Sequence, residues 1–331
     1  MPGAVLVHGG GATALADWVA LWVKRGYAAI SMDTCGCVPC WSPNPYFHPW
    51  PRHADGGPPG WGKLELAMEP VEEQWMYHAL GAVILGHSLL RSFPQVDATR
   101  IGVTGISWGG VLTLLAAGYD PRFAFAIPVY GTGFLNFPES ALAYGNPQVT
   151  EEQRQRWFEL FDPARILEKI SLPCFMLNGT NDLSFPLGSF WKTAAANPAQ
   201  TRMLVPLESP HNHTVSWQEE TQWLFAEKVL KGQPLPVITD CVRRDDMLRC
   251  RVSGGDFKRA AVCWSCGSGF WSGRKWRQTS ATLSQDNTIS CPLPRNTTAA
   301  YFTVETACGE QYSSMPYLAE EGALRAGRLP V

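Results

Sequence analysis

A serine flanked by glycines stands between a strand-like and a helix-like stretch of the sequence. Residues 105–109 are Gly-Ile-Ser-Trp-Gly, with Ser107 at the centre; an apolar run (101–105) leads into them and a helical pattern (111–117) follows. A serine hydroxyl attacks well when it projects from a sharp strand-to-helix turn, and the flanking glycines leave room for strand and helix to close around it. We therefore predict that Ser107 is the nucleophile of an acyl-transfer reaction.

A glycine-rich loop near the start of the chain is suited to bind a developing oxyanion. Gly10 and Gly11 belong to a His-Gly-Gly-Gly sequence that begins at His8, at the end of the first apolar run. Such an early loop supplies one backbone N–H donor, and the residue after the nucleophile supplies the other. The candidate donors are therefore Trp108 and Gly10 or Gly11. A phosphate-binding loop is the competing interpretation, but neither G-x-G-x-x-G nor a P-loop lysine is present there.

An acid and a base follow the serine in chain order. Asp182 comes after the apolar run 174–178, and His211 and His213 follow the next run. We expect His211 to take the Ser107 proton and return it to the leaving group, while Asp182 holds the imidazole tautomer and stabilises the imidazolium. His213 is the alternative base; His211 is preferred because it lies nearer the strand. A turn-capping role is the alternative for Asp182, because it follows Asn-Gly.

Short apolar runs alternate with helical patterns over the first two-thirds of the chain, which predicts a mostly parallel sheet covered by helices. Helical patterns cover residues 15–23, 69–92 and 215–231. The carboxyl ends of parallel strands share one edge of the sheet, where open α/β folds build their sites. The predicted strands are residues 4–8, 28–33, 101–105, 125–130, 174–178 and 203–207.

The pattern changes after residue 233 to short β-rich stretches separated by Gly, Asn, Ser and Pro. This spacing favours a small antiparallel β-sandwich. We predict a catalytic domain at 1–233 and an accessory domain at 234–331. The predicted accessory strands are residues 237–241, 247–252, 260–265, 288–291 and 299–306.

The four motifs around His8, Ser107, Asp182 and His211 resemble those of the α/β-hydrolase superfamily, in its dienelactone hydrolase, acetyl xylan esterase and prolyl-oligopeptidase-like branch. Three longer segments are similar to bacterial members of that branch that carry the name acetyl xylan esterase: residues 31–39, 52–62 and 120–129. The resemblance spans residues 4 to about 232. It implies an α/β-hydrolase fold and serine hydrolase chemistry through an acyl-enzyme, with no metal and no cofactor.

The composition excludes several partners. The chain has 331 residues, of which 17% are charged, and a net charge of −2. It carries no block of like charge for nucleic acid, and no apolar run near the roughly 20 residues that cross a bilayer. Met1 is followed by no signal-peptide pattern, which predicts a cytoplasmic protein. The glycine-rich loop begins unusually early, at His8, so either the sheet is shortened at one edge or the native N-terminus is missing; in the second case secretion or a periplasmic location is the alternative.

An aromatic-rich segment over residues 35–62 is too long for an ordinary connection. We expect it to cover the active site, and Trp41, Trp50 and Trp61 are candidates for stacking on a sugar; burial of the segment itself is the competing role. Cysteines 35, 37 and 40 resemble half of a zinc site, but no second pair accompanies them in the first domain. The six cysteines of the second domain favour disulfides or buried thiols, with the pairing left open.

These features predict a serine carboxylic-ester hydrolase that acts on small acyl esters, including acetylated carbohydrates. The first alternative is a serine peptidase of the prolyl-oligopeptidase type acting on short peptides. The second is a non-catalytic carbohydrate-binding protein on a hydrolase scaffold. The sequence leaves the natural substrate and the oligomeric state open.

Overall fold

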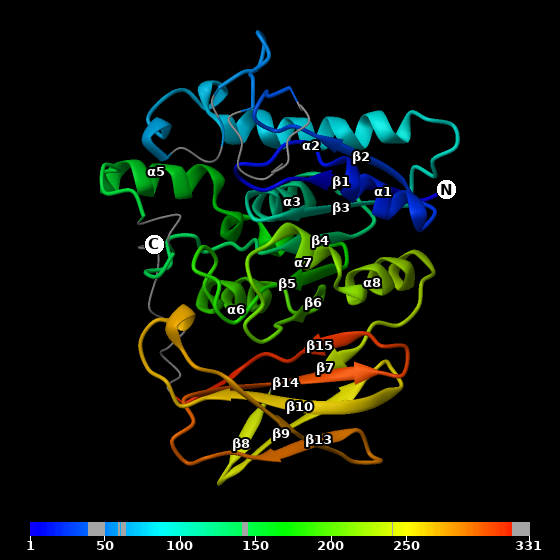
Figure 1. Ribbon diagram of the computed structural model, residues 1–331, viewed down its shortest axis with the longest axis vertical. Helices are drawn as coiled ribbons and strands as arrows, with labels where there is room; N and C mark the ends of the chain where they lie inside the picture. The colour runs from blue at the N-terminus through cyan, green and yellow to red at the C-terminus, as the bar shows by residue number, and fades with distance from the viewer. Residues whose placement is uncertain (39–49, 59, 61–63, 141–144, 240, 320–331) are drawn as a thin grey trace.

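A six-stranded, all-parallel sheet forms the centre of the larger part of the molecule (Figure 1). The computed structural model describes residues 1–38, 50–58, 60, 64–140, 145–239 and 241–319. The four inner strands are buried along their whole length, which is why they appear in the sequence as largely apolar runs. Each strand overlaps one of the six predicted runs. In sheet order they are β2 (Ala28–Met32), β1 (Gly3–Val7), β3 (Ile101–Ile106), β4 (Ala126–Val129), β5 (Cys174–Leu177) and β6 (Thr201–Leu204).

Helices cover this sheet and pack on one another. Helix α2 contacts α3, and α1 meets α8 through the rings of Trp22 and Trp223, whose centroids are 4.5 Å apart. Gly26 ends the first helical segment with φ 84°, a conformation that favours glycine. No helix in the described ranges is long and apolar enough to span a bilayer. The helices are α1 (Ala16–Lys24), α2 (Trp75–Arg91), α3 (Trp108–Tyr119), α5 (Glu151–Phe161), α6 (Leu187–Ala196), α7 (His213–Trp217) and α8 (Glu220–Leu230).

Two helical segments differ from the prediction. The single helix predicted over 215–231 is divided into α7 and α8, because the Glu219 carboxylate accepts from the backbone N–H of Thr221 and starts a new helix there. Helix α5 was not predicted, although a capping box marks its start: Thr150 accepts from the N–H of Gln153, and the Gln153 side chain accepts from the N–H of Thr150.

Two antiparallel sheets follow the parallel sheet and lie below it in Figure 1. Strand β9 shows the expected alternation, with Leu248, Cys250 and Val252 buried and the arginines between them exposed. One sheet holds β11 (Arg277–Ser280), β10 (Phe257–Ser265), β14 (Ala299–Thr306), β15 (Gln311–Ser313) and β16 (Tyr317–Leu318). The other holds β12 (Thr282–Leu283), β13 (Thr288–Pro292), β9 (Met247–Ser253), β7 (Val237–Ile238) and β8 (Val242–Arg244).

Aromatic and polar contacts join the antiparallel sheets to the parallel one. Trp191 of α6 packs edge-on against Trp271, with ring centroids 5.1 Å apart. The Tyr301 hydroxyl donates to the Val205 carbonyl at 2.8 Å, just beyond β6. These buried contacts join residues before position 233 to residues after it. The division of the chain into domains at 1–233 and 234–331 stays a prediction.

The pairing of β8 with β9 generates a prediction about two cysteines. Val242 lies opposite Arg249, so the next pair outward is Cys241 and Cys250. A hydrogen bond with Cys241, together with burial, raises the pKa of Cys250. Directly opposed residues of antiparallel strands have Cα atoms about 4.5–5.5 Å apart, which a disulfide can bridge.

We expect glutathione disulfide to oxidise this pair, releasing two molecules of reduced glutathione per Cys241–Cys250 bond. Peptide mapping by mass spectrometry of the treated, denatured protein should find the two peptides joined, and the Cys250→Ser variant should lack the cross-link. Full alkylation of both cysteines after treatment would contradict the expectation.

Candidate active site

Ser107 occupies a strained turn between β3 and α3. Its backbone angles are φ 60° and ψ −120°, although it is not a glycine. Two backbone hydrogen bonds hold it: its N–H donates to the Val129 carbonyl at 2.8 Å, and its carbonyl accepts from the N–H of Val111 at 3.1 Å. Strain of this kind persists only where the surrounding structure enforces it, and it is concentrated at functional sites.

Neighbouring glycines allow the backbones around this turn to approach closely. A Cβ atom on Gly105 would collide with the Gly109 carbonyl, and one on Gly109 would collide with the Val7 carbonyl at the end of β1. A Cβ atom on Gly110 would lie 2.7 Å from the Val129 carbonyl of β4. Alanine at any of these positions would therefore force strand and helix apart.

The strain at Ser107 generates a prediction about stability. Ser107→Gly should raise the free energy of unfolding by about 1 kcal/mol relative to Ser107→Ala. Strained backbone costs roughly 1–3 kcal/mol, and the larger entropy loss of glycine offsets roughly 0.5–1 of it. Urea denaturation of the two variants makes the comparison, because both lack the hydroxyl. Equal midpoints would show that the turn is not strained.

Asp182 and His211 form a hydrogen-bonded pair on loops that follow β5 and β6. The Nδ1 atom of His211 lies 2.7 Å from Oδ2 of Asp182. The other oxygen of Asp182 accepts from the backbone N–H groups of Ser184 and Phe185, each at 2.8 Å. Since the buried carboxylate can only accept, Nδ1 of His211 donates and its Nε2 is left as the acceptor.

Two aromatic rings stack on the His211 imidazole. The ring centroids of Tyr130 and Phe185 lie 4.8 and 6.0 Å from that of the imidazole, with interplanar angles of 30° and 8°. Tyr130 itself has φ 50°, directly after β4. Tyr130 is the last residue of the predicted strand 125–130, and an aromatic residue at the carboxyl end of a parallel strand is the signal in the sequence for its place in the site.

His213 has different surroundings from His211. It begins α7, and its Nε2 accepts from the backbone N–H of Gly9 at 3.2 Å. Burial, aided by the neighbouring His8 and His211, lowers the pKa of His213 to about 3. A group that weakly basic is poorly matched to proton abstraction at neutral pH. These surroundings favour His211 as the base, while His213 accepts a hydrogen bond from the glycine-rich loop.

The low pKa of His213 predicts a pH dependence of stability. Between its ordinary value of 6.5 and about 3, the unfolded chain binds a proton at this position and the folded chain does not. Acidification below about pH 6.5 therefore favours unfolding. In His213→Gln, the free energy of unfolding should fall less steeply as the pH decreases, and the difference in slope should correspond to about one proton. Burial also lowers the pKa of His8 and of His87, so part of the slope remains. Urea midpoints from pH 4 to pH 8 test this, and an unchanged slope would contradict it.

The glycine-rich loop lies against the turn that carries Ser107. A Cβ atom on Gly9 would come within 2.9 Å of the Ile106 carbonyl, and Gly11 has φ 76°. Trp108 is the first residue of α3, so its N–H is among those that the helix leaves without an internal partner. The structure thus brings Trp108, Gly10 and Gly11 to the same edge of the sheet as Ser107.

Three residues beside this loop could hold a metal ion by residue type. The ligand atoms of His8, Asp33 and Cys35 lie within 4.8 Å of one another. However, Asp33 accepts from the N–H groups of Cys35 and Cys37 at 2.7 and 2.8 Å, and His8 Nε2 accepts from the N–H of Thr34. Burial raises the pKa of the Cys35 thiol to about 12, so it is not a thiolate. We interpret the cluster as a network that closes the loop after β2, and we propose no metal there.

The predicted aromatic contacts have different outcomes. Trp50 is only 6% exposed, so it offers little surface to a ligand. Trp41 and Trp61 lie outside the described residues. The aromatic surroundings of the turn come instead from Trp75 and Trp157, which were not among the predicted site residues. Each packs edge-on against the ring of Trp108, with ring centroids 5.8 and 5.9 Å away.

Sequence comparisons relate the chain to known hydrolases. The sequence pattern of the prolyl oligopeptidase family matches residues 69–228. The acetyl esterase Axe7A of Xylanibacter ruminicola is 22% identical over 178 residues, which are 51% of this chain and 40% of that protein. The chain therefore spans about two fifths of the length of this curated relative.

Solved structures share the fold. An acetyl xylan esterase from Paenibacillus sp. R4 matches with a TM-score of 0.53 and 25% identity, over 69% of this chain and 74% of its own. An acylaminoacyl peptidase of Pyrococcus horikoshii matches with a TM-score of 0.52 and 19% identity, over 70% of this chain and 38% of its own. Together with the parallel sheet and its helices, these matches confirm the predicted α/β-hydrolase fold, followed here by a β-rich C-terminal region.

Proposed function

Because the chain has the α/β-hydrolase fold and is similar to prolyl oligopeptidases and acetyl xylan esterases, we propose that it is a serine hydrolase of carboxylic esters. The observation that supports this most directly is the 2.7 Å contact between His211 and the buried Asp182, at the sheet edge where Ser107 occupies its strained turn. A carbohydrate-binding protein without catalysis would not require the strained backbone of Ser107.

In the first half of the reaction, Nε2 of His211 takes the Ser107 proton as Oγ attacks the ester carbonyl carbon. The carbonyl oxygen becomes an oxyanion, which the N–H groups of Trp108 and of Gly10 or Gly11 stabilise. Collapse of the tetrahedral intermediate breaks the bond to the alcohol oxygen, which receives the proton from His211. The acyl group is then esterified to Ser107.

Water completes the cycle. His211 takes a proton from the water, whose oxygen attacks the acyl carbon. The second tetrahedral intermediate collapses, Ser107 recovers its proton from His211, and the carboxylic acid leaves. Throughout, Asp182 accepts from Nδ1 of His211 and stabilises the imidazolium without taking the proton itself.

Short acyl esters, including acetyl esters of carbohydrates, are the proposed substrates. The names of two relatives support this class, since one is an acetyl esterase and the other an acetyl xylan esterase. A peptidase acting on short peptides is the second candidate, favoured by the match to the prolyl oligopeptidase family and by the acylaminoacyl peptidase structure.

Variants of the three proposed catalytic residues should lose turnover of p-nitrophenyl acetate. We expect kcat to fall by about 10⁴-fold or more in Ser107→Ala and His211→Ala, and by about 10⁴-fold in Asp182→Asn, where the imidazole tautomer is wrong. His213→Gln is the matched control and should stay within about 10-fold, because glutamine can still accept from Gly9. Undiminished turnover in Ser107→Ala would contradict the nucleophile, and a larger loss in His213→Gln than in His211→Ala would exchange the two histidines.

The choice between ester and peptide substrates has its own experiment. Acetylated xylan and an X-Pro dipeptide p-nitroanilide are offered to the wild type and to Ser107→Ala. We expect Ser107-dependent acetate release from the polysaccharide, with kcat/KM for the anilide at least 100-fold below that for p-nitrophenyl acetate. The reverse ranking would favour the peptidase.

A further inference from the structure

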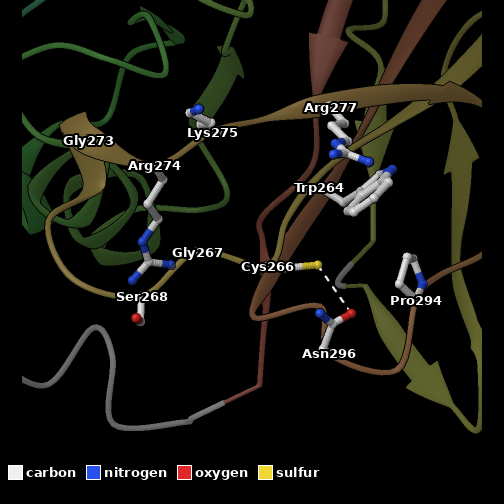
Figure 2. A pocket seen from close by; sticks show the side chains of 10 residues that line it. All are labelled: Trp264, Cys266, Gly267, Ser268, Gly273, Arg274, Lys275, Arg277, Pro294 and Asn296. Carbon is white, nitrogen blue, oxygen red and sulfur yellow. Dashed lines mark hydrogen bonds between the residues drawn. The ribbon is translucent and has the colours of Figure 1, made fainter.

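A cavity lies in the C-terminal sheets and includes none of the proposed catalytic residues. Its volume is about 530 Å³, within the range of pockets that hold small ligands. Figure 2 shows Trp264 and Arg277 on one side, Arg274 on the other and Cys266 between them. The lining residues come from the end of β10, the segment before β11 and the loop between β13 and β14.

Basic side chains dominate the charge of this cavity. Arg274 is held in place, since its guanidinium lies 3.6 Å from the centre of the Trp271 ring and donates to the Gly269 carbonyl. Glu139 is near enough to Arg274 to offset part of its charge. Among the residues described, however, no carboxylate forms an ion pair with Lys275 or with Arg277. Two cations thus line a concave surface without acidic partners, which attracts an anion.

Flat apolar and hydrogen-bonding surfaces complete the cavity. Trp264 is partly exposed, and its orientation is held by a hydrogen bond from Nε1 to Oγ1 of Thr279 at 3.1 Å. Arg277 lies over the same indole, 5.5 Å from the ring centre. The exposed Asn296 accepts from Sγ of Cys266 through Oδ1, which leaves its amide nitrogen to donate.

We propose that this cavity binds a carboxylate-bearing saccharide. The indole of Trp264 would stack on the apolar face of a sugar ring, Lys275 and Arg277 would pair with the carboxylate, and Asn296 would hydrogen-bond a hydroxyl. A neutral sugar would leave the two cations unused, and a simple inorganic anion would leave the indole and much of the volume unused.

The cavity is attached to the loop of the proposed catalytic acid. The side-chain amide of Asn181 donates to the carbonyl oxygens of Ser272 at 3.0 Å and Arg274 at 3.4 Å, and Asn181 directly precedes Asp182. This contact joins the segment that carries Arg274 to the loop that carries Asp182, so the cavity would serve as an accessory subsite for an acidic polysaccharide substrate. This last step rests on the proposed esterase function; the binding itself does not.

The binding experiment uses the full chain with Ser107→Ala, so that hydrolysis cannot interfere. Trigalacturonic acid is titrated by calorimetry, with its carboxyl-reduced, neutral counterpart as the matched ligand. We expect the neutral ligand to bind at least 10-fold more weakly, and the affinity for the acid to fall with added salt.

Variants locate the site. The Lys275→Gln/Arg277→Gln pair and Trp264→Ala should each weaken binding of the acid at least 10-fold, while Trp264→Phe should retain binding within about 3-fold. Arg249→Gln is the control, because it removes an exposed arginine from the other antiparallel sheet. Circular dichroism melts check that each variant is folded.

Several results would overturn the proposal. One is an equal affinity for the acid and for its neutral counterpart. Another is a loss of affinity in Arg249→Gln as large as that in the cavity variants. The third is displacement of the acid by inorganic phosphate at matched concentration, to the same extent in the protein with and without Trp264→Ala. Failure of the proposed function is separate, since it appears as absent hydrolysis of p-nitrophenyl acetate by the wild type while the calorimetric result stands.

Discussion

The close packing of helix α3 against the ends of β1 and β4 is the constraint on which the candidate site depends. Gly109 lies against the Val7 carbonyl and Gly110 lies against the Val129 carbonyl, so no side chain fits between these backbones. This contact forces Ser107 into a conformation that serine rarely adopts. It also places the start of α3, with its N–H groups that lack internal partners, beside the glycine-rich loop. The same packing therefore positions Ser107 and the proposed oxyanion donors.

The two histidines show how burial divides roles between like side chains. His211 keeps a partly exposed ring, 30% of its side chain, and pairs with a buried carboxylate. Burial of His213 lowers its pKa to about 3, and its Nε2 accepts from the backbone N–H of Gly9. These surroundings fit the proposed role of His211 as the base and the contact of His213 with the glycine-rich loop. Tyr130 and Phe185 restrict the first ring further by stacking on it.

The C-terminal sheets contact both the parallel sheet with its helices and the loop of the proposed acid. Trp191, Trp271 and Tyr301 form a buried aromatic contact across the two parts, and the Lys228 ammonium pairs with the fully buried Glu310 at 2.5 Å. The segment that follows Trp271 reaches the acid loop through Asn181. A ligand bound beside Arg274 would therefore lie against a segment that is hydrogen-bonded to the loop of Asp182.

The sequence by itself determined the six parallel strands, the strand–Ser107–helix turn and the order of serine, acid and histidine, because apolar periodicity and glycine spacing are local properties. It did not separate α7 from α8 or reveal the rings around His211, since a side-chain cap and contacts between distant loops depend on the folded chain. It left the roles of His211 and His213 open, two residues apart, because spacing carries no information about burial. Only the tertiary structure distinguishes their surroundings, because it pairs His211 with Asp182 and removes His213 from water.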